Sequence, residues 1–212
     1  MSRKSAVVFI DGNNLYHNLK GLSIKPSCID LYKISELACA HFNREHKGSR
    51  YYNSIPDIKD GERVYYKHLK FLEDIRKLPK FRVFTRKLQS YTTKRLLQEK
   101  KEALGYLDLC DSCRPVVEAN CLDCIGKSRT KEKGIDVMIA VDMLNLCVLE
   151  DECDCCILIS GDADFVPASE IVKGHGKEVF SASVPRGYSW ELRNKLGFWA
   201  ISTDFLRENC LK

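Results

Sequence analysis

The sequence lacks the segments that carry a chain into or across a membrane. Its 212 residues contain no apolar run of the roughly 20 residues that a membrane-spanning helix needs. The opening Met1–Ser5 leads straight into a short apolar segment, without the apolar region of a signal peptide. We therefore expect a cytoplasmic protein that has no membrane partner.

Glycine-rich phosphate-binding loops are also missing. No Gly-x-Gly-x-x-Gly follows the first apolar segment, and no Gly-x-x-x-x-Gly-Lys-Ser/Thr loop occurs. Dinucleotide and nucleoside-triphosphate binding therefore lose their usual support. A haloacid-dehalogenase-like phosphatase is disfavoured because Asn13, not a second Asp, follows Asp11 by two residues. The cysteine-rich stretch 147–156 has no evident histidine partner for nucleophilic catalysis.

The composition is typical of one folded domain over residues 1–212. A chain of this length can bury a sizeable core. The net charge of +5 is mildly basic, so it permits a polyanionic partner without requiring one. The eleven cysteines, in a reducing compartment, indicate thiols or metal ligands rather than disulfides.

Helical and strand patterns alternate along the chain, which predicts an α/β fold with a mainly parallel sheet. The first helix can be capped by Asn13 or Asn14. The expected strands are 6–10, 63–69, 81–88, 155–159, 177–184 and 198–202, and the expected helices are 13–19, 31–42, 71–78, 132–149, 166–174 and 190–196. Residues 90–130 break the alternation and form a Cys-rich insertion.

Two acidic turns follow strands that read as buried on both faces. Asp11 comes directly after the first strand, and Asp162 and Asp164 come after the strand 155–159. Functional crevices in open α/β sheets lie beyond the carboxyl ends of the strands, so we expect these carboxylates to converge. A divalent cation would relieve their mutual repulsion.

Asp136 is a further acidic candidate, near the start of an apolar helix that we expect to be largely buried. A buried carboxylate is costly unless it is paired, hydrogen-bonded or metal-bound. Glu132 stands four residues earlier on the same face. Both residues could instead simply complement the positive N-terminus of the helix.

Three ordered motifs carry a resemblance to a known family. They are Phe9–Asn14 (FIDGNN), Lys131–Val137 (KEKGIDV) and Leu158–Phe165 (LISGDADF). With these motifs the chain resembles the NYN domain family of the PIN-like nuclease superfamily, in its bacterial regulator-like branch. The resemblance implies a Rossmann-like, PIN-like sheet of order 3-2-1-4-5 with helices on both faces.

The same resemblance implies a Mg²⁺ or Mn²⁺ site and endonucleolytic cleavage of RNA, with single-stranded RNA as the expected partner. The family's acidic positions correspond to Asp11, Asp136, Asp162 and Asp164, with Asn13 and Ser160 as polar neighbours. We expect Asn14 and Glu132 to support the site as well. Carboxylate-held hard cations can activate water and stabilise the charge that develops during phosphodiester hydrolysis. A non-catalytic RNA-binding or regulatory module with the same fold is the alternative.

Two Cys-x-x-Cys pairs lie in the insertion 90–130. Cys110 and Cys113 form the first pair, and Cys121 and Cys124 the second. Four thiolates suit one tetrahedral Zn²⁺, which would fold this segment as a structural zinc knuckle. Disulfides or free thiols are the alternatives.

Basic residues surround these pairs and could form a phosphate-binding rim. The nucleic-acid-binding candidates are Lys94, Arg95, Arg129, Lys131 and Lys133. An ordinary solvated helix face explains the same charges equally well.

Overall fold

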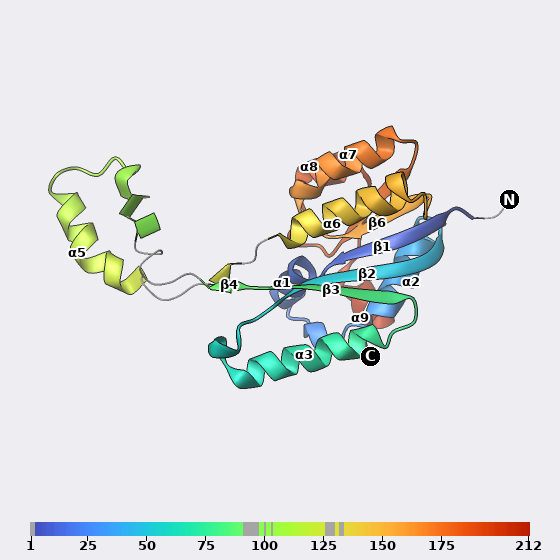
Figure 1. The fold of residues 1–212 in the computed structure, drawn as a ribbon, viewed down its shortest axis with the longest axis horizontal. Helices are drawn as coiled ribbons and strands as arrows, with labels where there is room; N and C mark the ends of the chain where they lie inside the picture. The colour runs from blue at the N-terminus through green and yellow to red at the C-terminus, as the bar shows by residue number, and fades with distance from the viewer. Residues whose placement is uncertain (1–2, 91–97, 100, 103, 126–129, 132–133) are drawn as a thin grey trace. The chain divides into compact units, whose positions relative to one another are not determined.

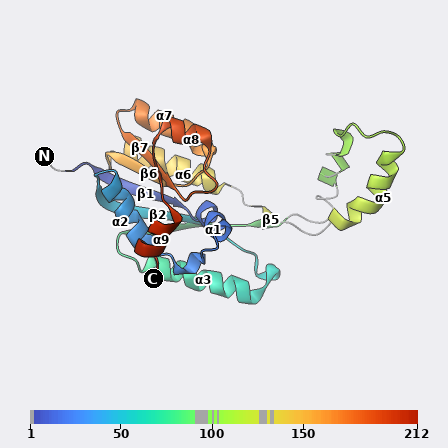
Figure 2. The same ribbon diagram turned by 180° about the vertical axis from the view of Figure 1, so that it is seen from behind.

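The computed structural model describes residues 3–90, 98–99, 101–102, 104–125, 130–131 and 134–212. The chain divides into two compact units (Figures 1 and 2). The first unit comprises Met1–Arg86 with Gly134–Lys212, and the second comprises Lys87–Lys133. Each unit is described by itself below.

The first unit is built on a six-stranded sheet in the order β3-β2-β1-β6-β7-β8. Parallel pairs join β1 to β2 and β6, β6 to β7, and β7 to β8. The strands are β1 (Ser5–Asp11), β2 (Glu45–Ile55), β3 (Phe81–Lys87), β6 (Cys155–Ile159), β7 (Glu178–Ser183) and β8 (Gly197–Ala200). The order implied by the resemblance is found, with β8 added beyond the fifth strand.

Helices cover both faces of this sheet (Figure 1). On one face lie α1 (Gly12–Gly21), α2 (Leu31–His41), α3 (Glu62–Arg76) and α9 (Thr203–Asn209), and on the other α6 (Ile135–Leu144), α7 (Val166–Gly174) and α8 (Trp190–Lys195). Val8 and Ile10 of β1 pack in the core of the first face, while Val7 and Phe9 pack in that of the second. This alternation buries apolar side chains on both sides, each contributing about 1.5–3 kcal/mol. The predicted α/β class with helices on both faces is confirmed.

Short helical turns complete the unit. They are η1 (Pro26–Cys28), η2 (Ile58–Asp60), η3 (Asn145–Leu149) and η4 (Ala163–Phe165). The turn η3 is π-helical and continues α6, and η4 leads into α7. Among the described residues, no helix is long and apolar enough to cross a membrane.

The second strand was predicted in the wrong place. Residues 63–69 belong to α3, and β2 lies instead at Glu45–Ile55. The segment 63–69 is rich in β-branched and aromatic residues, yet it is helical and both Val64 and Tyr66 are exposed. The β2 segment is rich in polar residues, and it is a strand because tertiary contacts on both sides bury its second half.

Two helix predictions also need correction. The helix α1 begins at Gly12 and is capped by Asp11, not by Asn13 or Asn14. The helix α6 is less buried than expected, because Val137 and Val141 are exposed. The C-terminal helix α9 was not expected from the sequence.

The second unit contains a short antiparallel pair and a helix. The pair joins β4 (Gln89–Ser90) to β5 (Thr130–Lys131), and the helix is α5 (Cys113–Ile125). The thiols of Cys110 and Cys113 are exposed. Hydrogen bonds from Ser112 and Cys113 lower the pKa of the Cys110 thiol to about 7.

The predicted zinc knuckle is not supported. One continuous helix carries Cys113 and Cys121 eight residues apart, a rise of about 12 Å, whereas each zinc–sulfur bond spans only about 2.3 Å. No group of three or more metal-ligating side chains forms in the described part of the chain. The side chains of Cys121 and Cys124 lie outside the described residues.

Candidate active site at the carboxyl edge of the sheet

Asp11 ends β1 at the centre of the sheet, with only 4% of its surface exposed. Its Oδ1 accepts a hydrogen bond from the Asn14 backbone N–H at 3.0 Å. Its Oδ2 accepts one from the Ser160 hydroxyl at 3.1 Å. A buried carboxylate persists only with such hydrogen-bonded compensation, so this position is built to hold a negative group.

The turn after β6 joins Asp162 to this carboxylate through Ser160. The Ser160 Oγ donates to Asp11 and accepts from the Asp162 backbone N–H at 3.3 Å. The Asp162 Oδ1 in turn accepts from the Asp164 N–H at 3.0 Å and caps η4. Neighbouring parallel strands β1 and β6 therefore present their acidic turns at the same edge.

Asn14 ties the same turn to α1. Its side-chain Oδ1 accepts from the Gly161 backbone N–H at 3.1 Å and from Asn18 Nδ2 at 2.8 Å. Gly161 is required here because a Cβ at this position would collide with the Gly187 carbonyl. The Ser189 N–H donates to the Gly161 carbonyl at 2.8 Å, which anchors the loop before α8 to the site.

Asp136 and Asp164 lie on elements beside this centre. Asp136 is partly exposed in the first turn of α6, and that helix contacts both β1 and η4. Asp164 is exposed, within η4. The structure thus connects Asp11 directly to the Asp162 turn, but no three acidic side chains of the described residues gather as one ligand group. Glu132 lies outside the described residues.

Polar residues at the end of β2 complete the edge, and sequence reasoning missed them. The Asn53 Nδ2 donates to the Tyr51 hydroxyl oxygen at 2.8 Å, and Asn13 Nδ2 donates to Ser54 Oγ at 3.3 Å. Burial, reinforced by the charge of Asp11, raises the pKa of the Tyr51 hydroxyl. Functional residues of open α/β sheets follow the carboxyl ends of the strands, and this rule singled out Asp11. It would also have singled out Asn53 and Ser54 if β2 had been recognised in the sequence.

The oxygen atoms at this edge fit a hard divalent cation. Asn53 is 4% exposed, and its buried Oδ1 accepts no hydrogen bond from the described residues. The buried carboxylate of Asp11 lies at the same edge, at the end of the neighbouring strand β1. Mg²⁺ and Mn²⁺ prefer such carboxylate and amide oxygens, whereas soft metals prefer thiolates.

The basic residues expected at the nucleic-acid surface belong to the second unit, Lys87–Lys133. The residues Lys94, Arg95, Arg129 and Lys133 lie outside those described. Lys131 is described only as part of the strand β5.

The NYN domain family profile matches residues 5–198. This match covers most of the chain, so the protein is a member of the NYN domain family. A crystal structure of a protein of unknown function from Vibrio parahaemolyticus RIMD 2210633 is similar in fold, with a TM-score of 0.56 and 18% identity. The match covers 99% of this chain and 97% of that one. No curated protein matches the sequence.

Proposed function

We propose that the protein is a metal-dependent endoribonuclease that hydrolyses RNA phosphodiester bonds. The observation that carries the proposal is the buried Asp11 carboxylate, hydrogen-bonded through Ser160 to the Asp162 turn at the carboxyl edge of an NYN fold. Buried carboxylates at strand ends are costly to maintain, and cation binding is a function that requires them.

In this proposal Asp11, Asp136, Asp162 and Asp164 hold the Mg²⁺ or Mn²⁺ ion. The bound cation would lower the pKa of a water and stabilise charge on the phosphate. Ser160 and the Asn14 N–H orient the Asp11 carboxylate. Asn13 and the Asn53 Oδ1, which accepts no hydrogen bond from the described residues, would position water at the same edge.

Charge removal at the two connected aspartates tests the proposal. Purified protein is incubated with labelled single-stranded RNA in Mn²⁺, Mg²⁺ or EDTA, together with Asp11→Asn and Asp162→Asn. We expect cation-dependent cutting by the wild type and a loss of at least about 100-fold in each variant, as is typical when an electrostatic group is removed from an active site.

The chain offers matched controls. Asp30 caps α2 as Asp11 caps α1, accepting from a backbone N–H three residues later. Asp57 caps η2 as Asp162 caps η4, accepting from an N–H two residues later. Asp30→Asn and Asp57→Asn remove the same charge from the same kind of cap, so they should cut like the wild type. Equal cutting by all four variants would place the activity elsewhere.

A non-catalytic RNA-binding module is the second candidate. It is favoured by one observation, that the acidic side chains of the described residues do not gather as a ligand group of three or more. Retained RNA binding without cutting, across varied RNAs and both cations, would establish this candidate in place of the nuclease.

A further inference from the structure

The edge strand β3 presents alternating side chains to the two faces of the sheet. Phe81 and Val83 pack in the core under α2 and α3. Arg82, Phe84 and Arg86 belong to the other face, where Phe84 packs against the second core and both arginines are exposed. The two arginines are four positions apart, which is about 13 Å along the strand.

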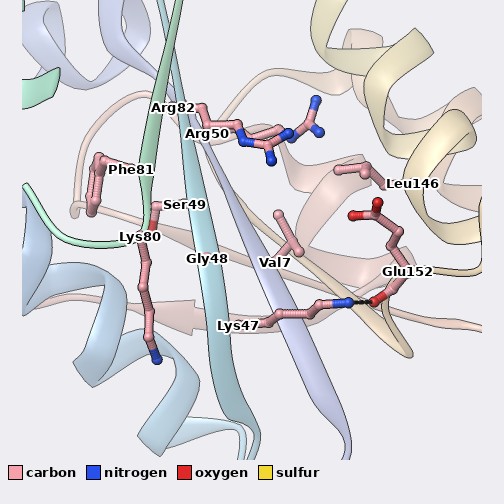
Figure 3. Close-up of a pocket in the computed structure, with 10 residues that line it drawn as sticks. All are labelled: Val7, Lys47, Gly48, Ser49, Arg50, Lys80, Phe81, Arg82, Leu146 and Glu152. Atoms are coloured by element: carbon pink, nitrogen blue, oxygen red, sulfur yellow. Dashed lines mark hydrogen bonds between the residues drawn. The ribbon is translucent and has the colours of Figure 1, made fainter.

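A cavity of about 260 Å³ lies at the amino end of the row formed by Arg82, Phe84 and Arg86 on β3. Figure 3 shows Arg82 and Arg50 reaching from β3 and β2 into the space that Leu146 and Glu152 face from the other side. The cavity is smaller than the 300–1,000 Å³ of usual small-molecule pockets. It has room for part of one nucleotide chain, and a double helix is far too wide for it.

The charges of this surface are only partly neutralised. Arg50 forms an ion pair with Asp142 at 2.9 Å. The Asp142 carboxylate also accepts a hydrogen bond from the Tyr52 hydroxyl at 2.6 Å. The Lys47 ammonium bonds the backbone carbonyl of Glu152. Within the part of the chain that the structure describes, Arg82 and Arg86 make no ion pair. These two guanidiniums are therefore available to an external anion.

Phe84 serves this surface as a support. Its ring stacks on Tyr52 with centroids 5.0 Å apart, and the Arg50 guanidinium lies 5.1 Å from its centroid. The ring thus already has partners, so we assign it no base-stacking role. Binding at this surface would depend on the phosphate backbone, with little sequence preference.

The row leads to the candidate active site. The Arg86 guanidinium packs against Gly134, whose φ of +83° and missing Cβ make room for it. Gly134 directly precedes the first turn of α6, which carries Asp136. The arginines of β3 therefore connect the cavity beside Leu146 with the acidic edge.

We propose that Arg82 and Arg86, with Arg50 beside them, bind the phosphates of a single RNA strand whose scissile bond lies at the Asp11 edge. This inference rests on the proposed function and adds the path of the substrate. Charge complementarity and continuity with the site support it. An edge strand also carries charges merely to prevent pairing with other sheets, and the experiment separates the two roles.

The test measures binding, so that it does not depend on cleavage. A fluorescein-labelled oligouridylate is titrated into full-length Asp162→Asn protein over a series of KCl concentrations. Each phosphate contact contributes about 0.7 to the slope of log K against log salt for a single strand. Arg82→Gln with Arg86→Gln should therefore weaken binding and reduce the slope by about 1.4. The single variant Arg82→Gln, distant from Gly134, should reduce it by about half as much.

Arg63→Gln with Arg207→Gln is the matched control, since both arginines are exposed but lie on α3 and α9. An unchanged slope in the Arg82/Arg86 variant, or an equal reduction in the control, overturns the path. Binding of duplex RNA as tight as that of the single strand also overturns it. If the slope falls as expected but the wild-type protein cuts no RNA, the path is supported and the nuclease proposal fails alone.

Discussion

Gly161 is the residue at which the candidate site is most sensitive to added volume. It lies between the acidic turn and the loop before α8, with its N–H bonded to Asn14 and its carbonyl bonded to Ser189. A Cβ there would meet backbone atoms of Gly187 and Tyr188, which cannot move aside as a flexible side chain can. The close approach therefore depends on glycine.

Gly161→Ala should lower the free energy of unfolding by about 1–3 kcal/mol, the usual cost of overpacking. It should also reduce any RNA cleavage, because the turn that carries Asp162 must shift. Gly174→Ala is the control, since its added Cβ meets no atom within 4 Å. Chemical denaturation of both variants measures the difference, and similar stability would show that the loop before α8 adapts freely.

The helix α6 was predicted at the right place in the sequence, but its burial was overestimated. Its apolar composition predicted a largely buried helix, yet Val137 is 65% exposed while Ile139 is fully buried. The buried stripe packs on β1 and Tyr52, because only one side of the helix faces the sheet. Exposed valines are compatible with a folded chain, since much of any protein surface is apolar.

Shortening a side chain should therefore reduce the free energy of unfolding much more on the buried side of α6 than on its exposed side. Ile139→Ala should cost about 2–5 kcal/mol of unfolding free energy, through lost burial and the cavity left behind. Val137→Ala should change it by less than about 0.5 kcal/mol. Urea denaturation of both variants gives the comparison. A large loss at Val137 would mean that this side of the helix is covered in solution.

Three histidines link the stability of the whole molecule to pH. They lie in α2, β2 and α3, and burial lowers the pKa of His41, His46 and His68 below the usual 6.5. The Nδ1 of His46 and the Nε2 of His68 are buried and have no hydrogen-bond partner among the described residues. Protonation would add charge at places that cannot solvate it.

The free energy of unfolding should fall as the pH drops below about 6.5. Over that range the unfolded chain binds more protons than the folded one, so stability increases with pH until both forms are neutral. His46→Gln with His68→Gln should flatten this dependence between about pH 7 and pH 5, whatever its effect at pH 8. Exposed His175→Gln is the control. Denaturation at several pH values provides the measurement, and an unchanged slope in the double variant would contradict the assignment.

Local patterns determined much of this protein. The apolar runs of β1 and β6 and the helix α7 lie where the sequence places them, because continuous burial and capping leave strong local signals. The carboxyl-end rule then placed Asp11 and Asp162 at one edge. The strands and the helix depend on neighbours within a few residues, and the rule needs only that the two strands be parallel neighbours, so the sequence alone could indicate these features.

Only the tertiary structure decided the position of β2 and the contacts made across the sheet. β2 is polar, and it becomes a strand because β1 and the helices on both faces surround it. The Ser160–Asp11 hydrogen bond joins residues 149 positions apart, and the packing of Arg86 on Gly134 joins two distant segments. Such contacts depend on how the chain returns to itself in three dimensions, and no local pattern encodes them.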